Sequence, residues 1–411
     1  MNKRNVVVTG LGTINGIGNN VDEFWSNAKK GVCGLSHITL FDPSLVRVKV
    51  VCEVKGFDPL NYMDIKRAKR MERFSQFAVV AANEAIKDSG LDFDKEDRFR
   101  VGVCVGSGIG SIEGVANNAL MQEKRGPRGI HPLVIPMIIP NMASAHISIA
   151  HGLHGKNINV STACASSNNC LGEALRTIQY GDADIMIAGG AEAEVTPLTL
   201  NGFSALSALC ESDDPNRASI PFDKERSGFV MGEGAGVVVL EEEEHAKKRG
   251  AKIYARLLGY GTTCDAFHMT APSDDKAYQS RCMRNAIDDA GLKPEDIDYV
   301  NAHGTSTKYN DLYETNAIKD CFGEHAAKLK ISSTKSMVGH LLGACGGVEM
   351  VAVCKTIQEG IIHQTVNYKV PDPELDLDYV VSGPVKQDVR YVISNCFAFG
   401  GHNTTIVAGK Y

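Results

Sequence analysis

The stretch Val8-Thr9-Gly10-Leu11-Gly12-Thr13 has a counterpart late in the chain, Leu257-Leu258-Gly259-Tyr260-Gly261-Thr262. Two further pairs repeat in the same order: AIKDSGL (85–91) with AIDDAGL (286–292), and RTIQYG (176–181) with KTIQEG (355–360). One pair could arise by chance, but three in the same order indicate an internal repeat.

Short apolar runs separated by helical patterns indicate strands that alternate with helices. The runs lie at residues 6–8, 101–105, 185–188, 237–240, 299–300, 393 and 404–407. This alternation is typical of an α/β fold. We therefore predict two similar α/β halves, residues 1–250 and 251–411, with a site between them.

Composition excludes several classes of protein. The 411 residues carry 43 Lys and Arg against 49 Asp and Glu, and this net charge of −6 argues against nucleic acid as the main partner. No apolar run is long enough to span a membrane, and the N-terminus runs straight into a strand-like segment rather than a signal peptide. The 12 cysteines are scattered without a Cys-x-x-Cys pair, so we expect a reduced, cytoplasmic protein.

Cys164 lies between a short extended run and a helical pattern. Apolar residues recur downstream at helical spacing, at Leu171, Ala174, Leu175 and Ile178, before Gly181 ends the helix. The free N–H groups and the positive dipole end at a helix start favour a thiolate. We therefore predict a nucleophile; the alternative is a buried structural cysteine.

A nucleophilic thiol usually works with a histidine. His303 directly follows a strand-like run, and His340 stands at the entrance to another helical pattern. In the repeat, the His340 segment takes the place that Cys164 has in the first half, so pseudo-symmetry predicts that the two face each other. The alternative for each histidine is a surface or core residue.

Four segments together resemble the β-ketoacyl-acyl-carrier-protein synthases of fatty acid synthesis. They are Ser161-Thr162-Ala163-Cys164, His303-Gly304-Thr305-Ser306-Thr307, residues 335–344 (KSMVGHLLGA) and residues 395–403 (NCFAFGGHN). The resemblance covers the whole chain and is greatest for the type II, elongating class. It implies a thiolase-like fold of two pseudo-symmetric halves in five α-β-α-β-α layers, and a homodimer.

The resemblance also implies a mechanism. Cys164 would take an acyl chain from acyl carrier protein, and His303 and His340 would donate hydrogen bonds to the thioester carbonyl of malonyl-carrier protein. Loss of CO2 would leave a carbanion that attacks the acyl-Cys164 thioester. The N–H groups of Cys164 and Phe399 would hold the resulting oxyanion. No metal, nucleotide or redox cofactor is implied.

Other matching positions suggest support for this chemistry. Lys335 and Glu349 match a charged pair of the family's active site, with Lys335 counted as catalytic and Glu349 as supporting. Asn301, Glu349 and Ser394 match positions that surround a monovalent cation in some relatives.

Further positions match substrate contacts. Thr305 and Thr307 match hydroxyls that hold the pantetheine arm, and Phe399 matches a gating side chain that swings aside to admit acyl chains. Ile109 matches a residue that lines the acyl pocket, although ordinary core packing explains it nearly as well.

Three positions depart from the family pattern. Ala398 replaces a glycine in the mobile loop, which would stiffen the gate if that position needs a positive φ. Lys308 replaces a proline, and Ser207 replaces an arginine that contacts carrier protein in relatives.

A basic surface remains available for an acidic carrier protein. Its predicted core is Lys66, Lys69, Arg70 and Arg128, with Arg67, Lys124 and Arg125 nearby. A solvated helix face is the alternative for most of these residues.

Three rival functions stay open at this stage. Gly10, Gly12 and Gly16 suggest a dinucleotide loop, but their spacing is one residue longer than the fingerprint of nicotinamide-dependent oxidoreductases. A non-catalytic chain-length partner would lack the nucleophile that Cys164 supplies. A polyketide-type ketosynthase would use the same chemistry on another chain.

Overall fold

The computed structural model describes residues 3–411. Its strands are β1 (Val6–Asn15), β2 (Ser36–His37), β3 (Val50–Val51), β4 (Val101–Gly106), β5 (Asn157–Ile158), β6 (Ile185–Glu192), β7 (Gly234–Glu242), β8 (Ala255–Cys264), β9 (Tyr299–Asn301), β10 (Lys330–Ser332), β11 (Ile361–Ile362), β12 (Val385–Lys386), β13 (Tyr391–Ala398) and β14 (His402–Gly409). Its helices are α1 (Val21–Lys30), α2 (Ile65–Ala68), α3 (Arg73–Ser89), α4 (Ile112–Arg125), α5 (Val134–Ile138), α6 (Met142–His151), α7 (Ser166–Gln179), α8 (Pro197–Ala205), α9 (Pro215–Ala218), α10 (Glu243–Lys248), α11 (Ala277–Asp289), α12 (Lys308–Phe322), α13 (Lys335–Val338) and α14 (Cys345–Glu359). Each apolar run noted in the sequence lies in a strand.

The main sheet repeats one topology twice. Within residues 3–411 it has ten strands in the order β10-β9-β13-β14-β8-β1-β7-β6-β4-β5. In the first half, β4 pairs in parallel with β5 and β6, and β7 pairs antiparallel with β6 and β1. In the second half, β9 pairs in parallel with β10 and β13, and β14 pairs antiparallel with β13 and β8. The repeat in the sequence is thus a repeat of strand order and direction.

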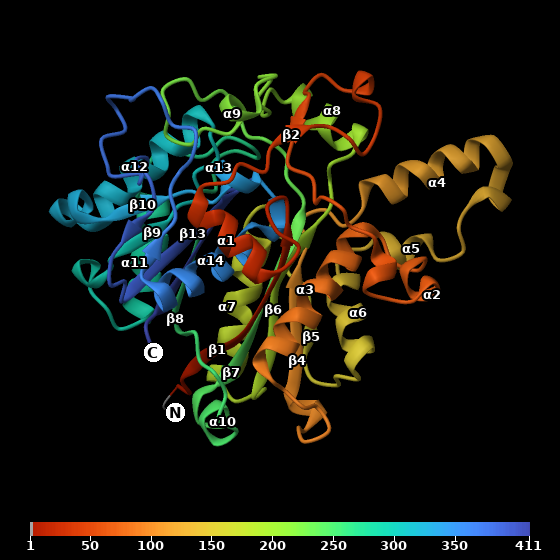
Figure 1. Cartoon of the computed structure of the whole chain (residues 1–411), viewed down its shortest axis with the longest axis horizontal. Helices are drawn as coiled ribbons and strands as arrows, with labels where there is room; N and C mark the ends of the chain where they lie inside the picture. Colours follow the sequence, from red (N-terminus) through yellow and green to blue (C-terminus); the bar gives the residue numbers. More distant parts are fainter. Residues whose placement is uncertain (1–2) are drawn as a thin grey trace.

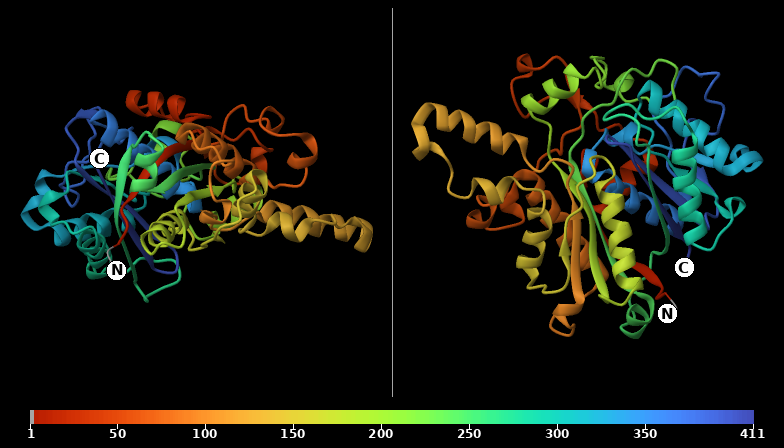
Figure 2. Two further views of the ribbon diagram at one scale, coloured as in Figure 1. Left: turned by 90° about the horizontal axis from the view of Figure 1, so that it is seen from below. Right: turned by 180° about the vertical axis from the view of Figure 1, so that it is seen from behind.

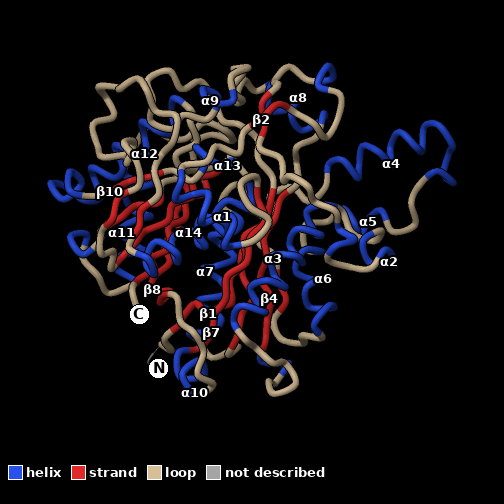
Figure 3. Tube along the Cα trace, viewed as in Figure 1, coloured by secondary structure: helices blue, strands red, loops and turns tan. Residues whose placement is uncertain are grey.

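Helices cover both faces of the sheet (Figures 1 and 3). α3 and α6 pack outside the first half, and α11 packs outside the second, with α12 against α11. α7 and α14 contact each other and strands of both halves, so they form a central layer. Strands covered on both faces read as continuous apolar runs, as in the fully buried β6. This arrangement confirms the predicted α/β class.

A helical hairpin projects from this layered body. α4 extends outward and the chain returns through α5, as the two views of Figure 2 show. No helix within residues 3–411 is both long and apolar enough to cross a membrane.

Glycines in β1 and β8 explain the repeated Gly-x-Gly. A Cβ at Gly10 would overlap the carbonyl oxygen of Ala85 on α3, and a Cβ at Gly259 would overlap that of Ala286 on α11. Each outer helix thus rests directly on a strand backbone. Gly10 lies inside β1 rather than in a loop, so the dinucleotide-loop alternative for this segment is wrong.

Gly259→Ala should lower the free energy of unfolding by about 1–3 kcal/mol, because the new methyl group must push α11 away from β8. Denaturant unfolding measures the change. Gly202→Ala on α8 is the matched control, since nothing lies within 4 Å of a Cβ there. Equal unfolding midpoints for the two variants would contradict the close-packing argument.

Candidate active site

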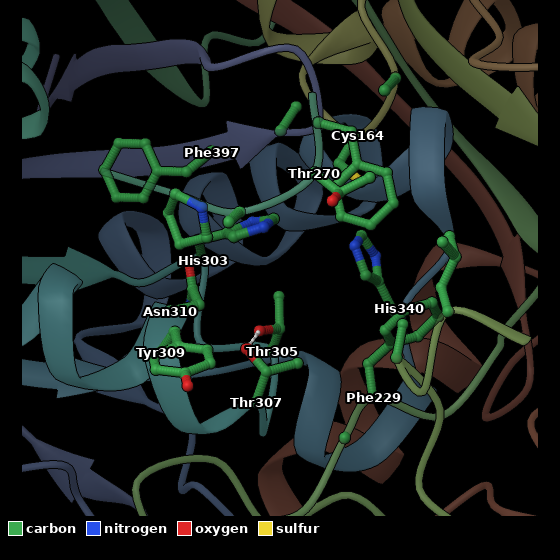
Figure 4. Close-up of a pocket in the computed structure, with 18 of the residues that line it drawn as sticks. Cys164, Phe229, Thr270, His303, Thr305, Thr307, Tyr309, Asn310, His340 and Phe397 are labelled. Carbon is green, nitrogen blue, oxygen red and sulfur yellow. Dashed lines mark hydrogen bonds between the residues drawn. The ribbon is translucent and has the colours of Figure 1, made fainter. Parts of the chain in front are cut away.

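A cavity of about 430 Å³ opens between the two halves. Figure 4 shows Cys164, His303 and His340 around it, with Thr305 and Thr307 on the wall below. Ile109 and Phe399 also line it. The structure therefore brings predicted site residues together in one cavity, although Ile109 and Phe399 are about 290 residues apart along the chain.

Cys164 sits on a tight turn between β5 and α7. The preceding Ala163 has a φ of 49°, a left-handed conformation that L-residues rarely adopt. The Ser166 hydroxyl holds this turn, because it accepts from the Thr162 N–H at 2.9 Å and donates to the Ala163 carbonyl at 2.7 Å. The strained turn directs the thiol into the cavity.

His303 follows β9 and is held from behind by α12. Glu314 accepts from the N–H groups of His303 and Gly304, both at 2.8 Å, and Asp311 accepts from that of Thr305 at 3.0 Å. Burial, the charge of Lys335 and the nearby second histidine hold the pKa of His303 well below its usual value. The buried Nδ1 has no partner within residues 3–411, so Nε2 is the nitrogen available to a substrate.

His340 is held in one tautomer. Its Nδ1 accepts from the Leu342 N–H at 3.2 Å and lies 3.0 Å from the Cys345 sulfur. The proton of the neutral ring therefore belongs on Nε2. Burial and the charge of Lys335 hold the pKa of His340 well below its usual value. The two imidazole centroids lie 5.4 Å apart, so two neutral rings share the cavity.

A buried ion pair lies behind the histidines. Lys335 Nζ donates to Glu349 Oε1 at 2.5 Å, and the two side chains are 1% and 2% exposed. Burial opposes the charge of Lys335, but the adjacent Glu349 carboxylate outweighs it and raises the lysine pKa. Neither residue lines the cavity, so the structure does not place Lys335 in contact with a substrate there.

Comparison with known proteins identifies this arrangement. Residues 3–246 match the N-terminal domain of β-ketoacyl synthases, and residues 254–369 match the C-terminal domain. The chain belongs to the β-ketoacyl synthase family.

Individual relatives cover the whole chain. It is 48% identical to 3-oxoacyl-acyl-carrier-protein synthase 2 of Staphylococcus aureus strain COL over 100% of this chain and 99% of the relative. It is 47% identical, with the same coverage, to the enzyme of that name from Synechocystis. A type II polyketide ketosynthase, solved with its acyl-carrier protein and bound to a hexaketide, matches with a TM-score of 0.93 at 35% identity over 100% of both chains.

These findings confirm several predictions. The chain is a β-ketoacyl synthase, an acyltransferase of the condensing-enzyme type, with the thiolase-like fold. The division at residue 250 and the roles of single site residues remain predictions.

The prediction that the helix start favours a Cys164 thiolate is wrong for the free enzyme. Burial raises the thiol pKa to about 12, and the nearby Glu192 carboxylate adds to this rise. Lys335 and the N–H groups of Cys164 and Phe399 lower the pKa, but burial outweighs them. This raised pKa favours a neutral Cys164 thiol in the free enzyme.

Glu192 was not found by sequence reasoning. This buried carboxylate accepts from the Ser107 hydroxyl at 2.6 Å, the Gly108 N–H at 2.8 Å and the Gly343 N–H at 2.9 Å. It thus ties a loop of the first half to the segment that follows His340. Only its place at the end of a buried strand gave any signal, since glutamate is rarely buried unless it is bonded.

The Phe399 segment is a tight turn between β13 and β14. Gly400 and Gly401 have positive φ values of 83° and 74°. Ala398 is the last residue of β13, and its φ is not positive. Ala398 is therefore unstrained here. The positive φ angles that favour glycine in this turn occur at Gly400 and Gly401 instead.

Two of the positions that depart from the family pattern lie at the cavity, whereas the predicted carrier-contacting residues do not line it. Lys308 and Ser207 both line it, and Lys308 is exposed as the first residue of α12. None of the four predicted carrier-contacting residues lines it, although all are exposed: Lys66, Lys69, Arg70 and Arg128.

Alkylation of Cys164 by iodoacetamide should accelerate about tenfold per pH unit from pH 7 to 10 without a plateau, because the reactive thiolate stays a minor species below a pKa of about 12. Mass spectrometry of the Cys164 peptide measures the rate. Alkylation of the exposed Cys264 in the same sample provides the internal control. A plateau below pH 8 would mean that Cys164 is already ionised in the free enzyme.

Proposed function

We propose that this synthase elongates acyl chains by two carbons, in a decarboxylative condensation of malonyl-acyl-carrier protein with an acyl group on Cys164. One observation carries the proposal: a cysteine on a strained turn shares a cavity with two neutral imidazoles. Neutral imidazoles suit hydrogen-bond donation to a developing oxyanion.

Acyl transfer would come first. The Cys164 sulfur attacks the acyl thioester of the carrier, the C–S bond to the carrier breaks, and the thiol proton ends on the departing pantetheine sulfur. The N–H groups of Cys164 and Phe399, which already lower the thiol pKa, would stabilise the tetrahedral oxyanion.

Condensation would follow at the histidines. The bond between the malonyl α-carbon and its carboxylate breaks, CO2 leaves, and the electron pair forms an enolate whose oxygen accepts from Nε2–H of His303 and His340. The α-carbon then attacks the acyl-Cys164 carbonyl. The C–S bond breaks, and the released thiolate takes up one proton. Lys335, held by Glu349, would keep both imidazoles neutral through its charge.

Two buried oxygens suggest a structural cation. Asn301 Oδ1 and Ser394 Oγ have no hydrogen-bond partner within residues 3–411. With Glu349 they would hold a monovalent cation, which would supply a fixed positive charge behind the site.

We also infer an acyl carrier protein partner, a homodimer and a cytoplasmic location. A similar ketosynthase is solved in complex with its acyl-carrier protein. The projecting hairpin exposes apolar side chains suited to burial against a second copy: Val115, Leu120, Leu133, Ile135 and Ile139. The 12 cysteines are all free, which supports a reducing compartment.

A polyketide-type ketosynthase is the second candidate. The similarity to a polyketide ketosynthase structure favours it, while the higher identity to 3-oxoacyl-acyl-carrier-protein synthases favours the first candidate. The presence of Cys164 argues against a non-catalytic chain-length partner. Products formed with a reductive system would separate the first two: fully reduced acyl chains against retained β-keto or unsaturated groups.

Cys164→Ser should abolish acylation by acyl-carrier proteins, because a hydroxyl ionises far less readily than the thiol it replaces. Cys164→Gln should abolish condensation yet retain malonyl decarboxylation, since both imidazole donors survive. Intact mass spectrometry and CO2 release measure the two reactions. Acyl label on another cysteine of Cys164→Ser would refute the nucleophile assignment.

His303→Ala and His340→Ala should each slow condensation by about 10²–10³-fold, the usual loss for one oxyanion donor. Acyl transfer to Cys164 should change much less. Single-turnover experiments separate the two steps. Wild-type condensation rates in both variants would exclude the proposed roles of the histidines.

A further inference from the structure

Gln279 is a buried polar residue in the wall of the substrate cavity, and its amide has no partner within the described residues. It lies in the first turn of α11, lines the cavity and is 2% exposed. Its Oε1 and Nε2 both lack a hydrogen-bond partner within residues 3–411. A buried amide in this state is costly, so it calls for a ligand group.

The other side-chain amides of the cavity are satisfied. Asn310 donates to Asp311 at 3.1 Å, and Asn403 donates to Asp265 at 2.6 Å. The hydroxyls of Thr305 and Thr307 bond each other at 2.9 Å. Gln279 therefore stands out from its polar neighbours on the same wall.

The chain on both sides of Gln279 is connected to the cavity wall. One turn further along α11, Met283 contacts Asn395, whose amide also donates to Glu314 behind His303. In the other direction, before α11 begins, Thr270, Ala271 and Pro272 also line the cavity. Gln279 thus belongs to a stretch of chain that borders the substrate cavity.

We propose that Gln279 binds an amide group of the pantetheine arm that carries the substrate. This inference rests on the proposed function, because that function requires a carrier arm in the cavity. The arm contains amide groups on the carrier side of its sulfur. A glutamine side chain, with one acceptor and two donor hydrogens, pairs with such an amide in both directions. Gln279 would thus select amide-bearing arms and position their thioester.

The test compares three hexanoyl thioesters as acyl donors to Cys164: those of pantetheine, of N-acetylcysteamine and of 1-pentanethiol, which has no amide. Gln279→Met keeps the size of the side chain and removes its amide. We expect it to lower kcat/KM about three- to tenfold for the two amide-bearing donors, the usual effect of losing a hydrogen bond, and to leave the pentanethiol ester unchanged. Gln358→Met, at an exposed glutamine of α14, is the matched control and should change none of them.

Stability provides a second readout. Gln279→Met should raise the Tm of the free enzyme, because it removes a buried amide that has no partner. A glutamine with a structural role would give the opposite shift. A lower Tm with equal losses for all three donors, or no kinetic change for any of them, would overturn the proposal.

Two further outcomes are distinguishable. If the defect of Gln279→Met appears only with a 3-hydroxyhexanoyl donor and not with hexanoyl donors, Gln279 binds the acyl chain rather than the arm, and the proposal fails. If the wild-type enzyme is not acylated by any thioester or acyl-carrier protein, the proposed function itself fails.

Discussion

The rest of the structure depends on how α7 and α14 meet at their N-terminal ends, between the two half-sheets. The Ser167 hydroxyl on α7 donates to the Gly343 carbonyl just before α14, and a Cβ at Gly346 would overlap the Asn168 side chain. This close approach leaves room only for glycine on the α14 side. It also sets the loops that enter the two helices side by side, so Cys164 and His340 reach one cavity from opposite halves of the repeat.

The electrostatic environment of the cavity favours the neutral forms of His303, His340 and Cys164. Behind the two histidines, the opposite charges of Lys335 and Glu349 lie 2.5 Å apart and offset each other. Burial and the nearby ammonium favour uncharged imidazoles, and burial favours an uncharged thiol. Under the proposed function, charge would develop on the substrate rather than on these resting groups, and the N–H groups of Cys164 and Phe399 would receive it.

The sequence predicted much of this, and the failures have physical reasons. The repeated Gly-x-Gly and the apolar runs were enough to predict a repeated α/β architecture, because both patterns reflect local packing of helices on strands. Cys164, His303 and His340 were recognised from their flanking motifs. The thiol pKa was misjudged because a local pattern reports the helix start but not the burial that distant segments impose. Gln279 carried no local signal at all, since only the packing of α11 on the cavity makes its amide unusual.

The seam between β1 and β8 has a consequence for how the chain is made. β1 is made before β8, yet it lies at the centre of the finished sheet, and its pairing with β8 covers only Val6–Val8 and Ala255–Leu257. A nascent chain that has completed the first half still carries β1 as an open edge, which invites pairing with other chains. β8 covers that edge, and β8 in turn is covered by β14, which is made after it. The edges at this seam are therefore protected against misassembly only once β14 has paired, and a chain cut short before β14 leaves them exposed.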